Sequence, residues 1–276
     1  MLKVRLIPVL LLKNGILVRS RNFTFHQLMG NHIEQVKRFS EWKADEIIYL
    51  DITRDSLYDL GSVRNVIGSS SSKAKVVKER KKNIIEIIQD LSKICRVPLT
   101  IGGKIRSLND IKSRLKAGAD KVVINTAAID DPEFIKKACK EFGSQCIVLC
   151  VDLKKTANKE EWKIFKSFGK EATNLKLLDW IKKIQDCGAG EILLQSIDRD
   201  GTSKGYDLEL IKFISKYIYV PFIILGGAGE FKNFVEAYKL NNNLSLAAAN
   251  IFHFTEQSIL NAKKFMHKNK INVRMF

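Results

Sequence analysis

Residues 188–202 read Gly-Ala-Gly-Glu-Ile-Leu-Leu-Gln-Ser-Ile-Asp-Arg-Asp-Gly-Thr, and this stretch decides the fold class. Within it, residues 191–196 form a short, mostly apolar run, which is typical of a strand buried on both faces of a parallel sheet. The flanking segments carry apolar residues at helical spacing, at positions 175, 178, 181 and 184 before the run and at 208, 211 and 214 after it. The pattern therefore predicts helix, strand and helix in succession.

The same alternation recurs along the whole chain. Strands are predicted over residues 4–12, 46–52, 98–102, 121–125, 146–152, 191–196, 221–226 and 244–250. Eight strand–helix units in 276 residues predict an α/β fold of the (β/α)8 TIM-barrel type, with eight parallel strands. An open doubly wound sheet is the alternative, but its usual glycine fingerprint does not follow the first strand. We expect a single domain over residues 1–276.

Two long connections and one internal repeat stand out. Residues 20–31 and the stretch from about 56 to 82 are too long for tight turns. We expect the first to be an active-site loop and the second, which contains Gly68-Ser69-Ser70-Ser71-Ser72, to be a flexible Ser-rich insertion. Glycine turns follow both the third and the seventh predicted strands, and this offset of four units suggests a duplicated half-barrel.

Composition excludes several classes of protein. The chain is 45% hydrophobic and 28% charged, and no apolar run approaches the ~20 residues that cross a bilayer. Pro8 breaks the N-terminal apolar run, which meets a turn rather than a cleavage site, so a first strand is favoured over a signal peptide. The five cysteines include no C-x-x-C pair. We therefore expect a reduced, cytoplasmic protein.

The formal net charge of +17 raises the question of a nucleic-acid partner. The lysines are spread over many predicted helices, and no basic stripe interleaved with aromatic residues is present. Solvated helix faces are therefore favoured, and we expect neither nucleic acid nor membrane as a partner. The positive charge would still help to gather phosphate esters.

In a parallel barrel, functional side chains lie at the carboxyl ends of the strands. Glycine-rich turns at those ends can present backbone N–H groups to an anion, although glycine also simply permits tight turns. Two such turns on opposite sides of the barrel would fit a substrate with a phosphate at each end. The predicted phosphate-binding residues are Gly102, Gly103, Asn125, Thr126, Asp200, Gly201, Gly226 and Gly227.

Asp152 is the candidate catalytic residue, because the apolar run 147–151 delivers its carboxylate to the same end of the barrel. The alternative is a helix cap or an ion pair with a neighbouring lysine. Asp51 has a similar position after the second strand, where it could instead be a structural partner. The four histidines lack metal-ligand spacing, so we expect no metal, and we expect no cofactor.

Several motifs occur in the order and spacing of a known family. They are Leu50-Asp51-Ile52-Thr53, Ala117 to Lys121, Ile124 to Ala128, Phe142 to Gln145, Gly188 to Leu194, Ser196 to Thr202, Gly226 to Gly229 and Ile251 to Phe254. On these motifs the chain resembles the cyclase subunit of imidazole-glycerol-phosphate synthase from end to end, except around the insertion.

The resemblance implies a partner and a route for ammonia. Members of that family form a heterodimer with a glutaminase docked at the bottom of the barrel, and ammonia released there travels up the interior. The resemblance places a charged gate at the bottom and a residue facing the glutaminase. The gate would be Arg5, Glu46, Lys121 and Glu191, and Asp120 would lie at the partner interface. Ordinary ion pairs closing the barrel floor are the alternative.

The top of the barrel departs from the family pattern. The family uses two carboxylates, at the ends of the first and fifth strands; Asp152 matches the second, but Leu11 stands at the first. Other substrate-site positions are occupied by Lys104, Gln195, Leu225 and Asn250. Residues 7–15 resemble paralogues that act with a glutaminase and a sugar amidotransferase on bacterial surface glycans, where the first-strand carboxylate is likewise apolar.

Three functions are open at this point, and whether the chain is itself an enzyme is open with them. We expect an ammonia-channelling barrel subunit of a glutamine-dependent amidotransferase system, which supplies nitrogen to a surface-glycan sugar and does not close an imidazole ring. The first alternative is a genuine cyclase subunit in histidine biosynthesis, with Asp51 in place of the missing carboxylate. The second is a non-catalytic activator of a glutaminase. In the first two, the ligand is a phosphate-bearing small molecule or sugar.

Overall fold

A computed structural model describes residues 3–53, 83–157, 161–253 and 258–275. The predicted Ser-rich insertion at 56–82 lies outside these ranges, and so does the Gly68–Ser72 tract within it. No helix in the described part of the chain is both long and apolar enough to cross a membrane. All five cysteines fall within the described ranges, and all five are free thiols.

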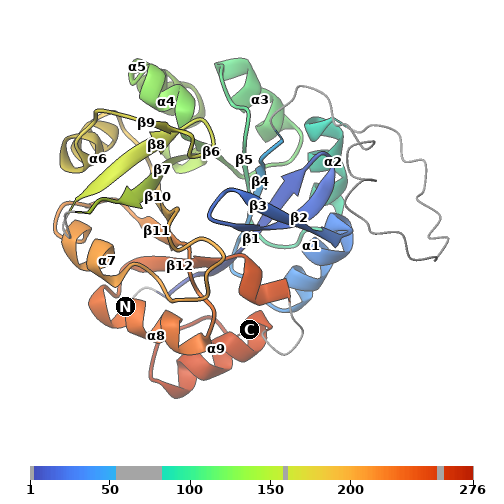
Figure 1. Ribbon diagram of the computed structural model, residues 1–276. Coiled ribbons are helices and arrows are strands. Elements are labelled where there is room, and N and C mark those ends of the chain that lie inside the picture. The colour runs from blue at the N-terminus through green and yellow to red at the C-terminus, as the bar shows by residue number, and fades with distance from the viewer. Residues whose placement is uncertain (1–2, 54–82, 158–160, 254–257, 276) are drawn as a thin grey trace.

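Eight parallel strands close into a barrel (Figure 1). In order around the barrel they are β1 (Leu6–Lys13), β4 (Ile47–Asp51), β5 (Leu99–Gly102), β6 (Lys121–Ile124), β7 (Ile147–Lys155), β10 (Glu191–Ser196), β11 (Phe222–Leu225) and β12 (Leu244–Ala248). The pairing of Leu6 in β1 with Leu246 in β12 closes the ring. Each predicted strand segment overlaps one barrel strand, so the (β/α)8 prediction is confirmed.

Helices lie between the strands and surround them (Figure 1). They are α1 (His32–Glu41), α2 (Ile84–Ile94), α3 (Leu108–Lys116), α4 (Thr126–Asp130), α5 (Glu133–Phe142), α6 (Leu177–Asp186), α7 (Leu208–Ile214), α8 (Phe231–Leu240) and α9 (Ile259–Lys268), with short 3-10 helices η1 (Ser144–Cys146) and η2 (Asn250–His253). Polar side chains begin several of them: Asn31, Ser107 and Ser258 each accept a hydrogen bond from a backbone N–H of the first turn.

Two antiparallel hairpins extend the barrel at the carboxyl ends of its strands. One is formed by β2 (Ile16–Arg21) and β3 (Phe25–Gly30), and the other by β8 (Trp162–Lys166) and β9 (Glu171–Ala172). The predicted active-site loop at 20–31 therefore lies mostly in a strand hairpin, since Ser20 pairs with His26 and Arg21 with Phe25.

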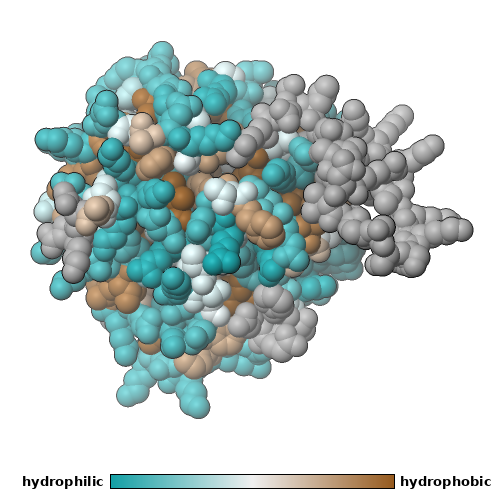
Figure 2. Space-filling view, in the orientation of Figure 1, coloured by the Kyte–Doolittle hydropathy of each residue, from teal (hydrophilic) through white to brown (hydrophobic). Residues whose placement is uncertain are grey.

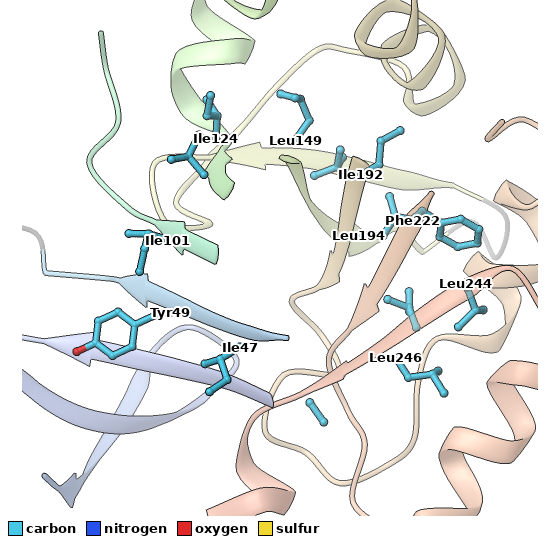
Figure 3. Packing of buried hydrophobic residues seen from close by; sticks show 14 of the residues in the cluster. Ile47, Tyr49, Ile101, Ile124, Leu149, Ile192, Leu194, Phe222, Leu244 and Leu246 are labelled. Atoms are coloured by element: carbon cyan, nitrogen blue, oxygen red, sulfur yellow. The ribbon is translucent and has the colours of Figure 1, made fainter. Parts of the chain in front are cut away.

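Side chains along each barrel strand alternate between two apolar clusters. Outward side chains pack against the helices, and Figure 3 shows Ile47, Tyr49, Ile101, Ile124, Leu149, Ile192, Leu194, Phe222, Leu244 and Leu246 arranged around the ring of strands. Inward side chains fill the interior: Ile7, Val9, Ile48, Val123, Val148, Leu193, Ile223 and Ala247. The middle of the barrel is therefore packed core. Hydrophilic side chains cover most of the face shown in Figure 2.

Phe252 tests this assignment of the core. Its ring stacks on Phe234 at a centroid distance of 5.9 Å and is fully buried. Phe252→Ala should lower the free energy of unfolding by about 3–5 kcal/mol, because it leaves a cavity. Phe25→Ala removes the same atoms from a side chain that is 62% exposed. It should change the free energy of unfolding by about 0.5 kcal/mol or less. Urea unfolding compares the variants, and equal losses would contradict the assignment.

Candidate functional site

Rows of inward side chains connect the two ends of the barrel. On β10, Glu191 lies at the amino end, Leu193 in the apolar middle and Gln195 at the carboxyl end. The row along β1 begins at Arg5, immediately before the strand, and ends at Leu11, about 20 Å away at ~3.3 Å per residue. Each row therefore places a charged group at the floor and a second side chain at the upper end.

The four predicted gate residues meet at the floor, and we call Arg5, Glu46, Lys121 and Glu191 the floor quartet. Arg5 Nη1 lies 2.8 Å from Glu46 Oε2, and Arg5 Nη2 donates a hydrogen bond to Glu191. Lys121 Nζ lies 2.9 Å from a carboxylate oxygen of Glu46 and 2.9 Å from one of Glu191. Each cation contacts both anions, so the cluster neutralises its own charge.

Burial makes this neutralisation necessary. Glu46 is 2% exposed and Glu191 is 5% exposed. Burial by itself would raise the pKa of Glu191, but the hydrogen bond and charge of Arg5, followed by the charge of Lys121, hold that pKa below its usual value. The role of the quartet as an ammonia gate stays a prediction.

Two hydroxyl groups complete the hydrogen bonding of the floor. Thr100 Oγ1 donates to Glu46 Oε1 at 2.6 Å. Ser245 Oγ accepts from Arg5 Nε at 3.0 Å and from Arg5 Nη2 at 2.7 Å. These contacts hold Glu46 and Arg5 in the orientation that the ion pairs need.

Asp120, the predicted partner-interface residue, is exposed immediately before β6, at the same end of the barrel as the quartet. Its carboxylate accepts a hydrogen bond from the backbone N–H of Leu99 at 2.7 Å. The position is compatible with a partner at the floor, and its contact with a glutaminase stays a prediction.

A cavity of about 420 Å³ opens at the carboxyl ends of the strands, and we call it the upper cavity. This volume is within the range of roughly 300–1,000 Å³ of small-molecule sites. Of the predicted residues, its lining includes Leu11, Gly103, Asn125, Thr126 and Asp152. The predicted site therefore comes together in part around one cavity.

Asp152 is the group in the upper cavity best placed for proton transfer. Its carboxylate accepts hydrogen bonds from Asn125 Nδ2 at 2.7 Å and from Cys150 Sγ at 3.2 Å. Burial, together with the charge of Asp200, raises the pKa of Asp152 to about 7, although the hydrogen bonds from Cys150 and Asn125 act in the opposite direction. Such a carboxyl group can donate or accept a proton near neutral pH.

Leu11 lies across the barrel from Asp152, because β1 and β7 are four strands apart in the ring of eight. The position at which the family resemblance implies a second carboxylate is therefore occupied by an apolar side chain. Asp51, the possible replacement, also lines the cavity: its Oδ1 accepts from the backbone N–H of Thr53 at 3.0 Å, and its Oδ2 lies 3.8 Å from Lys104 Nζ. Its carboxylate is thus engaged with a turn and with a cation.

In the turn after β5, Gly103 lies so close to the backbone of Asp51 that only glycine fits there. Gly103 has φ of +100°, and a Cβ there would lie 2.1 Å from the carbonyl oxygen of Asp51. Gly102 is the last residue of β5 and is not part of the lining. Lys104 and Arg106 place positive charges in the cavity wall. This side of the cavity can attract an anion.

Besides Gly102, four further predicted phosphate-binding residues are outside the lining of the upper cavity. They are Asp200, Gly201, Gly226 and Gly227. The Asp200 carboxylate instead accepts hydrogen bonds from Ser20 Oγ at 2.7 Å and from the backbone N–H of Phe23 at 3.2 Å. Phosphate binding by all eight predicted residues stays a prediction.

Several lining residues were not predicted from the sequence. Lys13 is the last residue of β1, so the strand-end rule could have found it, whereas Arg106 lies four residues beyond the end of β5. His26, whose Nδ1 lies 3.3 Å from Lys13 Nζ, belongs to the predicted active-site loop at residues 20–31. Phe168 comes from the β8–β9 hairpin, which no sequence motif indicated. In the described ranges, no group of three or more His, Cys, Asp or Glu side chains is arranged to hold a metal ion.

Comparison with known proteins gives one consistent family. The family described as "Histidine biosynthesis protein" matches residues 74–258. Imidazole glycerol phosphate synthase subunit HisF of Hydrogenobaculum sp. is 39% identical over 275 residues, and HisF of Clostridium botulinum (strain Okra) is 36% identical over 275 residues; in both, the match covers 100% of each chain. A Vibrio vulnificus protein, named provisionally as subunit hisF2 of the same synthase, is 40% identical over 100% of this chain and 92% of its own.

The raised pKa of Asp152 predicts a pH-dependent contribution to stability. An unfolded aspartate ionises near pH ~3.9, and folded Asp152 ionises at about 7. The folded state therefore holds an extra proton between these values, and the contribution is full below about pH 4 and lost as the pH rises through about 7. Asp152→Asn removes this contribution, so the free energy of unfolding of the variant should rise relative to wild type from pH 4 to pH 8.

Urea unfolding at several pH values measures this difference. Asp179→Asn, at an exposed position in the first turn of α6, is the matched control and should show no such rise. A difference between Asp152→Asn and wild type that stays constant with pH would contradict the assignment.

The floor quartet predicts strong coupling between its members. Arg5→Met leaves two buried carboxylates with one cation and should lower the free energy of unfolding by roughly 3 kcal/mol. Adding Glu191→Gln should recover part of this loss, with a coupling energy above about 1 kcal/mol in a double-mutant cycle. The exposed pair Lys136 and Glu133, 2.7 Å apart, should show no measurable coupling. Additive effects of Arg5→Met and Glu191→Gln would rule out a coupled quartet.

Proposed function

The chain belongs to the HisF cyclase family of imidazole glycerol phosphate synthase, and from this membership we propose that it is the ammonia-consuming barrel subunit of a glutamine-dependent synthase. A glutaminase docks at the barrel floor, around the floor quartet and Asp120, and releases ammonia there. A phosphate-bearing substrate occupies the upper cavity, where ammonia attacks it.

The proposal rests on the burial and the raised pKa of Asp152 in the upper cavity. A buried carboxyl group with a pKa of about 7 can take a proton from the attacking nitrogen and return it to a leaving oxygen at neutral pH. Asn125 and Cys150 orient that carboxylate by hydrogen bonds. Lys104 and Arg106 lie in the wall of the same cavity and supply positive charge for a phosphate.

The interior of the barrel supports passage of the neutral form of the nitrogen nucleophile. The layer between floor and upper cavity is apolar, with Ile7, Val9, Val148 and Leu193 among its members. An ammonium ion would lose its hydration there, whereas ammonia carries no net charge. Because this layer is packed, passage requires its side chains to move aside.

Ring formation is the first candidate for the reaction. The relatives carry the name of imidazole glycerol phosphate synthase, which favours a ring-forming cyclase over glycan amidation. Their names do not mention glycan chemistry.

Transfer of nitrogen to a glycan sugar without ring closure is the second candidate, and Leu11 favours it. An alkyl side chain cannot move a proton, and loss of one positioned acid or base costs ~100- to 10,000-fold in rate. In this candidate a sugar amidotransferase uses the nitrogen that the barrel delivers.

A direct assay separates the two candidates. We expect the purified chain, supplied with ammonium and the phosphorylated substrate of the family, to release imidazole glycerol phosphate, and Asp152→Asn to lower kcat by ~100- to 10,000-fold. Asp179→Asn is the matched control and should keep wild-type kcat. Chromatography of the products with time gives the rates.

The Leu11→Asp variant makes the outcome of this assay decisive. If wild type releases no imidazole product and Leu11→Asp does, the second candidate replaces the first. If neither protein consumes ammonium with this substrate, and none is consumed when a sugar phosphate and glutaminase are supplied, the proposed function is wrong.

A further inference from the structure

Cys150 lies next to Asp152 on the inward face of β7, one step closer to the floor. Inward side chains recur at every second residue of a strand, so Val148, Cys150 and Asp152 follow one another from the apolar layer to the upper cavity. Cys150 belongs to the interior apolar cluster and also lines the upper cavity. Its thiol therefore lies where a nucleophile that has crossed the apolar layer would meet Asp152.

The two carboxylate oxygens of Asp152 have different partners. Oδ2 accepts a hydrogen bond from Asn125 Nδ2 at 2.7 Å, and Oδ1 accepts one from Cys150 Sγ at 3.2 Å. An amide NH2 group can only donate, so it favours a free lone pair on Oδ2 whether the carboxyl group is charged or neutral. A thiol is a weak donor and a weak acceptor. Oδ1 is therefore the oxygen that can gain and lose a proton without disturbing the stronger hydrogen bond.

Cys150 stays a neutral thiol throughout this exchange. Burial, followed by the charge of Asp152 and the hydrogen bond to it, raises the pKa of Cys150 well above its ordinary value. The thiolate is the nucleophilic form of cysteine, so a thiol in this state does not attack a substrate. It donates to the carboxylate of Asp152 and turns its hydrogen away once Oδ1 is protonated. Cys150 thus acts through Asp152.

Other charged groups also face Asp152, and they do not change in a Cys150 variant. The charge of Asp200, after β10, acts on Asp152 directly. The remaining titratable or permanently charged groups of the lining are Lys13, His26, Asp51, Lys104 and Arg106. They have contacts of their own: Lys13 Nζ lies 3.3 Å from His26 Nδ1, Lys104 Nζ 3.8 Å from Asp51 Oδ2, and Arg106 Nη1 3.6 Å from Asp130 Oδ2. A difference between variants at position 150 therefore reports on the thiol.

We propose that Cys150 is a positioning residue: its thiol aims Oδ1 of Asp152 at the top of the apolar layer and makes Oδ1 the oxygen that takes the proton of the incoming nitrogen. This inference rests on the proposed function for the nitrogen itself, and it adds which oxygen reacts and what orients it. In the step, an N–H bond breaks, its electron pair stays on the nitrogen, and an O–H bond forms at Oδ1. Cys150 keeps its own proton.

Two substitutions at Cys150 separate hydrogen bonding from packing on the full chain. Cys150→Ser supplies a stronger donor, whereas Cys150→Ala supplies none. The carboxyl 13C shift of Asp152, assigned by its loss in Asp152→Asn, gives the titration midpoint. The midpoint should fall in Cys150→Ser and rise in Cys150→Ala, each by about half a pH unit, because a hydrogen bond to a carboxylate stabilises its charged form. Cys187→Ala removes a buried thiol outside the cavity lining and should leave the midpoint unchanged.

Turnover gives a second readout of the same variants. With ammonium and the phosphorylated substrate of the family, Cys150→Ala should lower kcat by roughly ten- to a hundredfold, because the carboxyl group is no longer aimed. Cys150→Ser should restore most of this loss, and the KM for the phosphorylated substrate should stay within about twofold in both, since the thiol acts on the proton transfer. Thermal unfolding of each variant verifies that the chain is folded at every pH used.

The outcomes distinguish this inference from the proposed function. Midpoints that stay constant, or that move in the same direction in both Cys150 variants, would overturn the inference while the proposed function stands. A wild-type chain that consumes no ammonium, although its midpoints follow the order Ser, Cys, Ala at position 150, would overturn the proposed function and leave Cys150 as the group that orients Asp152.

Discussion

Alternation of side chains along the strands ties the floor of this barrel to its upper cavity. On β6, the register that turns Lys121 inward at the floor also turns Val123 into the apolar middle and Asn125 toward Asp152. A slip of one residue would turn all three outward. The floor quartet resists such a slip, because its buried carboxylates require both cations.

The two ends of the barrel have different requirements. At the floor, the quartet forms a closed network in which every charge has two partners of opposite sign. In the upper cavity, Asp152 keeps a carboxyl group in an apolar setting opposite Leu11, and the β2–β3 hairpin lies over Gly201 and Asn250. The names of the relatives favour a ring-forming synthase, while Leu11 opposite Asp152 favours altered proton transfer.

The sequence predicted the strands because both of their faces are buried, which leaves long apolar runs that few other arrangements produce. It also predicted the upper-end positions of Asp152, Asn125 and Thr126, since the end of a parallel strand has one location in a barrel. It predicted an active-site loop at residues 20–31, and His26 of that segment lines the cavity, but it missed Phe168, which reaches the cavity from the other hairpin. Hairpin pairing depends on contacts outside the segment, such as those of Ser20 and Phe23 with Asp200, and no local pattern records them.

The sequence by itself determined the barrel, the inward rows and the identity of the side chain at the end of each row, because strand period and apolar runs are local properties. Only the tertiary structure decided which glycine turn is open. The turns after β5 and β11 look alike in sequence, but in the second turn Asn233 Oδ1 accepts hydrogen bonds from the backbone N–H groups of Gly229 and Glu230. Only the tertiary structure, likewise, set the pKa of Asp152, because burial among residues distant in sequence determines the cost of ionising it.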